Sequence, residues 1–117
     1  MNTSKPGTPG VVPSKTLITQ WLKTLFPDLP NSLKIEDFGD GVIYCRILNH
    51  FHNNPPQQRI CYNPRNEYDY VNNLKHVQAA LLQQGMVIPF DVNKISKRKF
   101  LENWQLINNF YKHYSGE

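Results

Sequence analysis

The sequence lacks the features of membrane-spanning, secreted and disulfide-bonded proteins. No apolar run approaches the ~20 residues that span a bilayer, and the N-terminal stretch MNTSKPGTPGVVP has no apolar signal-peptide core. Only two cysteines are present, Cys45 and Cys61, and neither has a Cys or His at a metal-ligand spacing. We therefore expect a soluble, reduced, cytoplasmic protein with no metal and no cofactor.

Recognisable catalytic motifs are also missing. The chain has no GxSxG, HExxH, P-loop or GxGxxG segment. The stretch DFGDG at 37–41 contains a kinase triplet, but 117 residues are too few for a kinase and the accompanying motifs are absent. His50 and His52 flank Phe51 and so lie on different faces of a helix. Cys61 lies near Arg59, which would favour a thiolate, yet no base is nearby in the sequence. We expect no enzymatic activity.

The composition is that of one small globular domain, with 39% hydrophobic residues and a formal net charge of +4. Residues 1–13 are rich in Ser, Thr, Gly and Pro, so we expect a disordered N-terminal arm there. We expect residues 14–117 to form the folded domain. The mild excess of cations favours an acidic partner without naming one.

Apolar residues recur at helical spacing in four stretches, and no alternating strand pattern is present. Ser14 is a candidate cap for a first helix, Asp40 for a second, and Asn66 for a third that ends at Gly85. A last helix is expected from about Lys97 to residue 114, after one helical turn at 91–95. The predicted class is all-α, with about four principal helices plus short connecting helices.

The stretch KISKRKF at 94–100 places four cations in six positions with no acid among them. If Ser96 caps the last helix, Lys97, Arg98 and Lys99 occupy its first turn, where the helix dipole disfavours each cation by about 0.3–1 kcal/mol. Such a local conflict favours a functional surface that meets an anionic partner. Phe100 is expected to be the core residue that fixes the start of this helix, while Lys94 precedes the cap.

Two groups of residues resemble a known family. DFGDGVIYCRILNHF at 37–51 is similar to the glycine-containing third helix of calponin-homology domains. NEYDYVNNLKHVQ at 66–78, followed by VNKISKRKFLENWQLINNFYKHY at 92–114, resembles the microtubule end-binding proteins, which track plus ends. The resemblance covers about 14–114 and implies a single calponin-homology domain. It also implies a non-enzymatic module that binds tubulin at the growing plus end of the microtubule lattice and regulates microtubule dynamics.

The resemblance further implies which residues contact tubulin, whose surface is acidic. The matching basic positions are Lys97, Arg98, Lys99, Arg59, Arg65 and Lys15. Family members usually have more lysines before the EYxY motif and a small residue at the position of Arg98, so the balance of contacts differs here. The resemblance places the protein at microtubule plus ends in the cytoplasm, the spindle included. It implies a monomer for these residues, and a homodimer where a coiled coil follows in a longer chain.

Two other classes of binding protein remain open. An actin-binding or adaptor calponin-homology domain is the main alternative, although actin binding usually takes two such domains in tandem. A helical nucleic-acid binder would also use basic residues before a helix, but the net charge is only +4 and no reading helix is recognisable. We expect neither nucleic-acid nor membrane binding.

Overall fold

The computed structural model describes residues 13–115, whose regular elements are all helices, with no strand among them. The expected all-α class is confirmed. The arm predicted for residues 1–13 lies outside the described residues except for Pro13, whose side chain is buried. In order along the chain, the elements are α1 (Lys15–Leu25), η1 (Ile35–Asp40), α2 (Val42–His52), η2 (Gln57–Arg59), α3 (Glu67–Gln83), α4 (Val92–Ile95) and α5 (Phe100–Tyr114), where η denotes a 3-10 helix.

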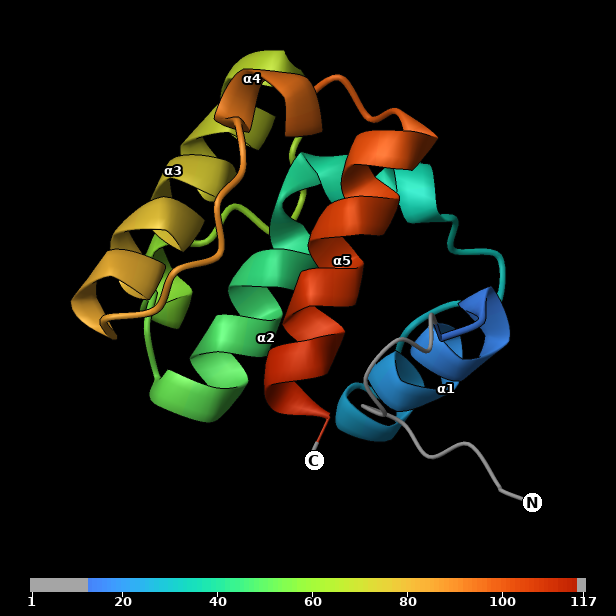
Figure 1. The fold of residues 1–117 in the computed structure, drawn as a ribbon. Coiled ribbons are helices and arrows are strands. Elements are labelled where there is room, and N and C mark those ends of the chain that lie inside the picture. Colours follow the sequence, from blue (N-terminus) through green and yellow to red (C-terminus); the bar gives the residue numbers. More distant parts are fainter. Residues whose placement is uncertain (1–12, 116–117) are drawn as a thin grey trace.

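Helices α2 and α5 lie side by side in the centre of the domain (Figure 1) and are joined by the rings of Tyr44 and Phe110, 5.2 Å apart. In the same view α3 lies on one side of this pair and α1 on the other, where Trp21 meets Tyr111 edge-on at 5.2 Å. The short helix α4 and the start of α5 lie at the same end of the domain as the start of α3. Residues far apart in the sequence therefore meet at this end.

Local side-chain caps determine where the main helices begin and end. The hydroxyl of Ser14 accepts from the backbone N–H of Leu17 at 3.0 Å, and the side chain of Asn66 accepts from that of Asp69 at 3.0 Å. Asp40 accepts from the N–H of Val42 at 2.9 Å, just before α2. Gly85, with a φ of 68°, follows the end of α3 in the left-handed conformation that glycine adopts readily. The signals at Ser14, Asn66 and Gly85 are confirmed, whereas the N-cap of α2 is Gly41 and not the predicted Asp40, which precedes it.

The core is formed where the inner faces of α1, α2, α3 and α5 meet. Cys45 is buried within it, its thiol donates to the carbonyl of Asn73 at 3.3 Å, and burial raises the pKa of the thiol. It therefore packs as a small apolar residue, as expected. The largest fully buried apolar side chains are Tyr44, Phe110, Ile18, Leu22, Ile35, Ile47, Leu48, Leu74, Ile107 and Val77.

The turn after α4 packs directly on η1, and glycine at position 39 makes this approach possible. A Cβ on Gly39 would lie 2.5 Å from the carbonyl oxygen of Ile95 and 2.8 Å from the Cα of Arg98. Both atoms belong to the backbone, so neither moves without shifting the chain. Gly39 is therefore required by the close packing that places the 95–98 turn.

Replacing Gly39→Ala is expected to lower the free energy of unfolding by about 2 kcal/mol, because the added methyl overpacks a backbone contact. Gly85→Ala is the matched control, since its Cβ meets nothing within 4 Å and only the positive φ of 68° opposes it. We expect that control to cost about 1 kcal/mol. Urea unfolding of both variants measures the difference. A Gly39→Ala variant as stable as Gly85→Ala would show that the 95–98 turn adapts freely.

Candidate functional site

The cation-rich segment at 94–100 runs from α4 into the start of α5. The expectation that Ser96 caps the last helix is wrong. Asp91 accepts from the N–H groups of Asn93 and Lys94 at 2.9 and 3.3 Å, which starts α4. Ser96 is therefore the C-cap of α4 and not the N-cap of the last helix. Its side chain is buried, its hydroxyl donates to the carbonyl of Asn93 at 3.0 Å, and it lies 3.5 Å from Glu67 Oε2.

Helix α5 begins only at Phe100, with Lys99 as its N-cap residue and no side-chain cap bond. Arg98 has a φ of 59°, in the left-handed region, so the chain cannot continue as one helix from α4 into α5. Lys97 and Arg98 are thus outside the first turn, which instead holds Glu102, as the helix dipole favours. The dipole conflict inferred for three cations applies only to Lys99.

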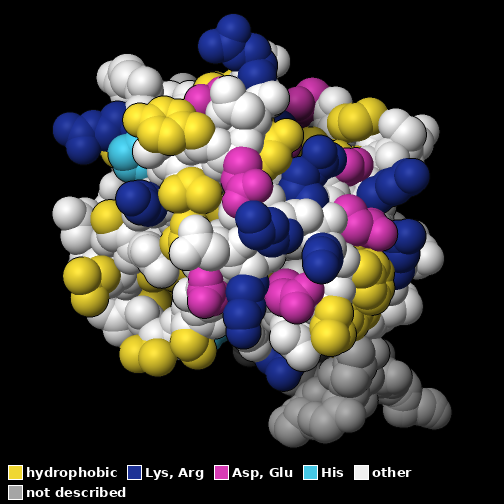
Figure 2. Space-filling model, turned by 90° about the horizontal axis from the view of Figure 1, so that it is seen from above, with side chains coloured by type: hydrophobic (Ala, Val, Ile, Leu, Met, Phe, Trp, Pro, Cys, Tyr) yellow, Lys and Arg dark blue, Asp and Glu magenta, His cyan; other side chains and the backbone are white. Residues whose placement is uncertain are grey.

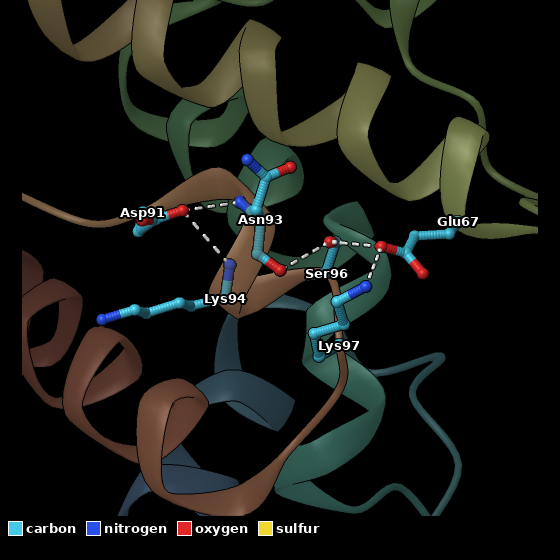
Figure 3. A network of polar contacts seen from close by, with 6 residues as sticks. All are labelled: Glu67, Asp91, Asn93, Lys94, Ser96 and Lys97. Atoms are coloured by element: carbon cyan, nitrogen blue, oxygen red, sulfur yellow. Dashed lines mark hydrogen bonds and ion pairs between the residues drawn. The ribbon is translucent and has the colours of Figure 1, made fainter.

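The ammonium of Lys97 forms an ion pair with Glu67 at the start of α3. Lys97 Nζ lies 2.8 Å from Glu67 Oε2, and the two side chains are 55% and 49% exposed. Figure 3 shows Glu67 reaching from α3 toward Ser96 and Lys97, while the ammonium of Lys94 points away from it. The hydrogen bond from Lys97 is the largest cause of the lowered pKa of Glu67. The pair therefore stabilises the fold when Glu67 is ionised, and this contribution is lost as the pH falls below the ordinary glutamate value of 4.5.

The guanidinium of Arg98 is held more tightly than the ammonium of Lys97. Its Nη2 lies 2.6 Å from Asp37 Oδ1 in η1, with side-chain exposures of 39% and 32%. Its Cζ also lies 5.6 Å from the centre of the Tyr70 ring, a cation–π distance. Arg98 therefore ties the α4–α5 connection to η1 and α3.

Lys99, like Lys94, has an exposed side chain and no carboxylate within ion-pair distance among residues 13–115. Its backbone carbonyl accepts from the side chain of Asn103 at 3.0 Å, so the main chain at this point is fixed. The ammonium thus projects from an ordered backbone at the positive end of α5.

Asn103, one turn into α5, holds the backbone between Ile95 and Lys99 in place through hydrogen bonds. The sequence did not single out this residue. Its side chain is fully buried, and its Nδ2 donates to the carbonyls of Lys99 and Ile95 at 3.0 and 3.3 Å. Its Oδ1 accepts from the Tyr44 hydroxyl at 2.8 Å. Burial raises the pKa of the Tyr44 phenol well above 10.0, so the hydroxyl keeps its proton and donates. A polar residue at a core-facing helix position was the signal that the sequence offered.

A second buried asparagine, Asn73, ties the long connection at 53–66 to the domain at Cys61. Asn73 Nδ2 donates to the carbonyls of Asp40 and Cys61, both at 3.0 Å, and its Oδ1 accepts from the Cys61 N–H at 2.9 Å. The connection that carries Arg59 and Arg65 is therefore tied to η1 and α3 close to Cys61.

The expected core role of Phe100 is wrong. The side chain is 44% exposed and stacks on Trp104 with ring centres 5.7 Å apart, and the next residue, Leu101, is 58% exposed. The core face of α5 is instead lined by Asn103, Leu106, Ile107, Phe110 and Tyr111. Phe100 lies outside the core because α5 starts at this residue and the side chain of Asn103 faces inward in its place.

The six predicted contact residues are not gathered in one patch. Arg65, two residues before Glu67, lies at the same end of the domain as residues 97–99, because Glu67 pairs with Lys97. Arg59 is exposed in η2, on the connection from the far end of α2, and Lys15 opens α1, on the opposite side of α5 from α3 (Figure 1). Figure 2 looks down on the end with α4 and shows cations and acids interspersed rather than a patch of one sign.

Within residues 13–115, no three His, Cys, Asp or Glu side chains converge as metal ligands. Nor does that part of the chain contain a helix long and apolar enough to span a membrane. The side chain of His52 forms a hydrogen bond within the domain, with its Nε2 2.9 Å from the Tyr114 hydroxyl.

Comparison with known proteins finds curated relatives that match most of this chain. The chain is 30% identical over 105 residues to Protein BIM1 of Saccharomyces cerevisiae, which covers 90% of this chain and 30% of the relative. It is 28% identical over 74 residues to Microtubule integrity protein mal3 of Schizosaccharomyces pombe, covering 63% of this chain and 24% of the relative. The chain thus spans about a third or less of the length of these curated relatives. No protein-family model matches it.

A solved structure described as "Structural Basis of Microtubule Plus End Tracking by XMAP215, CLIP-170 and EB1" contains a chain with the same fold. The TM-score is 0.73 at 28% sequence identity, over 89% of this chain and 90% of that one. The similarity therefore extends over nearly the whole described domain.

Proposed function

The chain belongs to the microtubule end-binding family, as a calponin-homology domain of that type, and from this premise we propose that it binds microtubules. The domain is a non-enzymatic module that recognises tubulin in the growing plus-end lattice and thereby regulates microtubule dynamics. It acts in the cytoplasm at microtubule ends, those of the spindle included. We assign this role to residues 14–117, acting as a monomer, or as a homodimer where a longer chain supplies a coiled coil.

One observation carries the proposal: the match to a chain from a plus-end tracking structure covers 89% of this chain. The name of the S. pombe relative, a microtubule integrity protein, supports the same partner. Actin binding is the alternative, and no relative reported above favours it.

The geometry ranks the proposed contact residues. We place Lys99 at the centre, because its exposed and unpaired ammonium projects from a backbone that Asn103 fixes, at the positive end of α5. Lys97 and Arg65 lie at the same end and contribute beside it. Arg98 acts mainly by holding the connection in place, through Asp37 and the Tyr70 ring. Arg59 and Lys15 serve as outlying contacts, since they lie on other elements.

Co-sedimentation of the wild-type domain with stabilised microtubules tests the proposal. We expect binding at low salt that weakens several-fold toward ~150 mM salt, because exposed charges more than ~8 Å apart are then largely screened. Actin filaments provide the matched control polymer, and we expect the domain to stay in the supernatant with them. Pelleting with actin but not with microtubules would reverse the assignment. Imaging of a tagged domain on dynamic microtubules measures the preference for growing ends.

A further inference from the structure

The ion pair between Lys97 and Glu67 places a competing carboxylate inside the proposed binding surface. We propose that Glu67 limits the affinity of the domain by holding Lys97, and that binding transfers the Lys97 ammonium from Glu67 to a carboxylate of tubulin. The inference rests on the proposed function and concerns the same surface. It assigns to an acidic residue of α3 a role in setting the strength of binding.

The exposure of the pair makes the exchange feasible. Lys97 Nζ lies 2.8 Å from Glu67 Oε2, and about half of each side chain is open to solvent, at 55% and 49%. A carboxylate from a partner can therefore approach the same ammonium without opening the core. Exposed ion pairs contribute little to stability because solvent screens them, so breaking this one costs little.

The neighbouring pair of Arg98 and Asp37 does not suit such an exchange. The distance from Arg98 Nη2 to Asp37 Oδ1 is 2.6 Å, shorter than that between Lys97 and Glu67, and both side chains are less exposed. The guanidinium also lies over the Tyr70 ring. The backbone of Arg98 packs against Gly39. Releasing Arg98 would therefore disturb the connection that positions Lys99, whereas releasing Lys97 leaves the backbone in place.

Charge strengthens the argument for Glu67. Lys97 and Glu67 together present no net charge to a partner, while Lys99 presents one positive charge. An acidic surface would be repelled by Glu67 and attracted by Lys97, so the wild-type pair cancels much of the attraction that Lys97 alone would supply. Removing the charge of Glu67 is expected to free Lys97 and strengthen binding by about two- to five-fold at low salt.

The experiment compares Glu67→Gln with wild type in co-sedimentation with stabilised microtubules at low salt. Glu102→Gln is the matched control: it is the same substitution, three residues after Lys99, at a carboxylate without an ion pair to any residue of 13–115. A double-mutant cycle adds Lys97→Met, with and without Glu67→Gln, because only a cycle isolates the coupling between two residues.

A gain with Glu67→Gln that exceeds the gain with Glu102→Gln, and falls by about half or more in the Lys97→Met background, supports the inference. An unchanged or weaker affinity for Glu67→Gln overturns it. So does a gain that persists without Lys97, since that would be a long-range charge effect. A wild-type domain that never pellets with microtubules overturns the proposed function itself, and this inference with it, so the two failures are distinguishable.

Discussion

Lys99→Glu is expected to weaken binding to stabilised microtubules by about fifty-fold, because it turns an attraction to an acidic surface into a repulsion at the centre of the proposed contact. The stability of the domain should not fall with it. Lys99 is the N-cap residue of α5, at the positive end of the helix dipole. An anion there is favoured by about 0.3–1 kcal/mol, so the midpoint of thermal unfolding should stay constant or rise.

Lys112→Glu is the control for this prediction. Lys112 is exposed in the last turn of the same helix, and the substitution makes the same change of two charges. At the negative end of the dipole it should lower stability slightly while leaving binding within about two-fold of wild type. Lys99→Glu would then lower binding without lowering stability, and Lys112→Glu would lower stability slightly with little effect on binding. Equal losses of binding would show that net charge alone governs the interaction and that Lys99 has no special place.

The helices could be predicted because their signals lie within a few residues of one another. Ser14 caps α1 through the N–H three residues later, and Asn66 caps α3 in the same way. Gly85 ends α3 because the left-handed conformation costs glycine little. None of these features depends on the tertiary fold, so apolar spacing and side-chain chemistry were sufficient.

The connection between α4 and α5 could not be predicted in the same way, because two caps compete within six residues. Asp91 and Ser96 can each cap a helix, and the sequence favoured Ser96 for the longer one. In the structure Asp91 starts α4 and Ser96 ends it, so α5 starts later. The contacts that fix this outcome are distant in sequence: Glu67 pairs with Lys97 across 30 positions, and Asp37 with Arg98 across 61.

The face of α5 was misassigned for a related reason. Apolar type suggested that Phe100 faces the core, whereas Asn103 takes the fully buried position. An asparagine is placed there because the chain must satisfy backbone carbonyls at a break between helices. Residue type alone does not reveal that requirement, since it arises from how α4 and α5 meet.

Asn103→Leu is expected to lower the free energy of unfolding by about 3 kcal/mol, the largest loss of stability that we predict. The substitution keeps the side chain close to its size but removes three hydrogen bonds, those with Lys99, Ile95 and the Tyr44 hydroxyl, at 3.0, 3.3 and 2.8 Å. Each contributes about 1 kcal/mol, and the Tyr44 hydroxyl keeps only a 3.3 Å contact to the Asn103 carbonyl. Urea unfolding monitored by circular dichroism measures the loss.

Asn109→Leu is the control, because it makes the same substitution at a half-buried position of the same helix. No hydrogen bond of the Asn109 side chain is found within residues 13–115, so we expect a change within about 0.5 kcal/mol. Hydrogen exchange adds a local readout: the amides of residues 96–99 should lose protection in Asn103→Leu well before the amides of α2. If Asn103→Leu were as stable as Asn109→Leu, or if protection fell uniformly, Asn103 would be one core residue among others. A selective loss would show that one buried side chain fixes the backbone from which Lys99 projects.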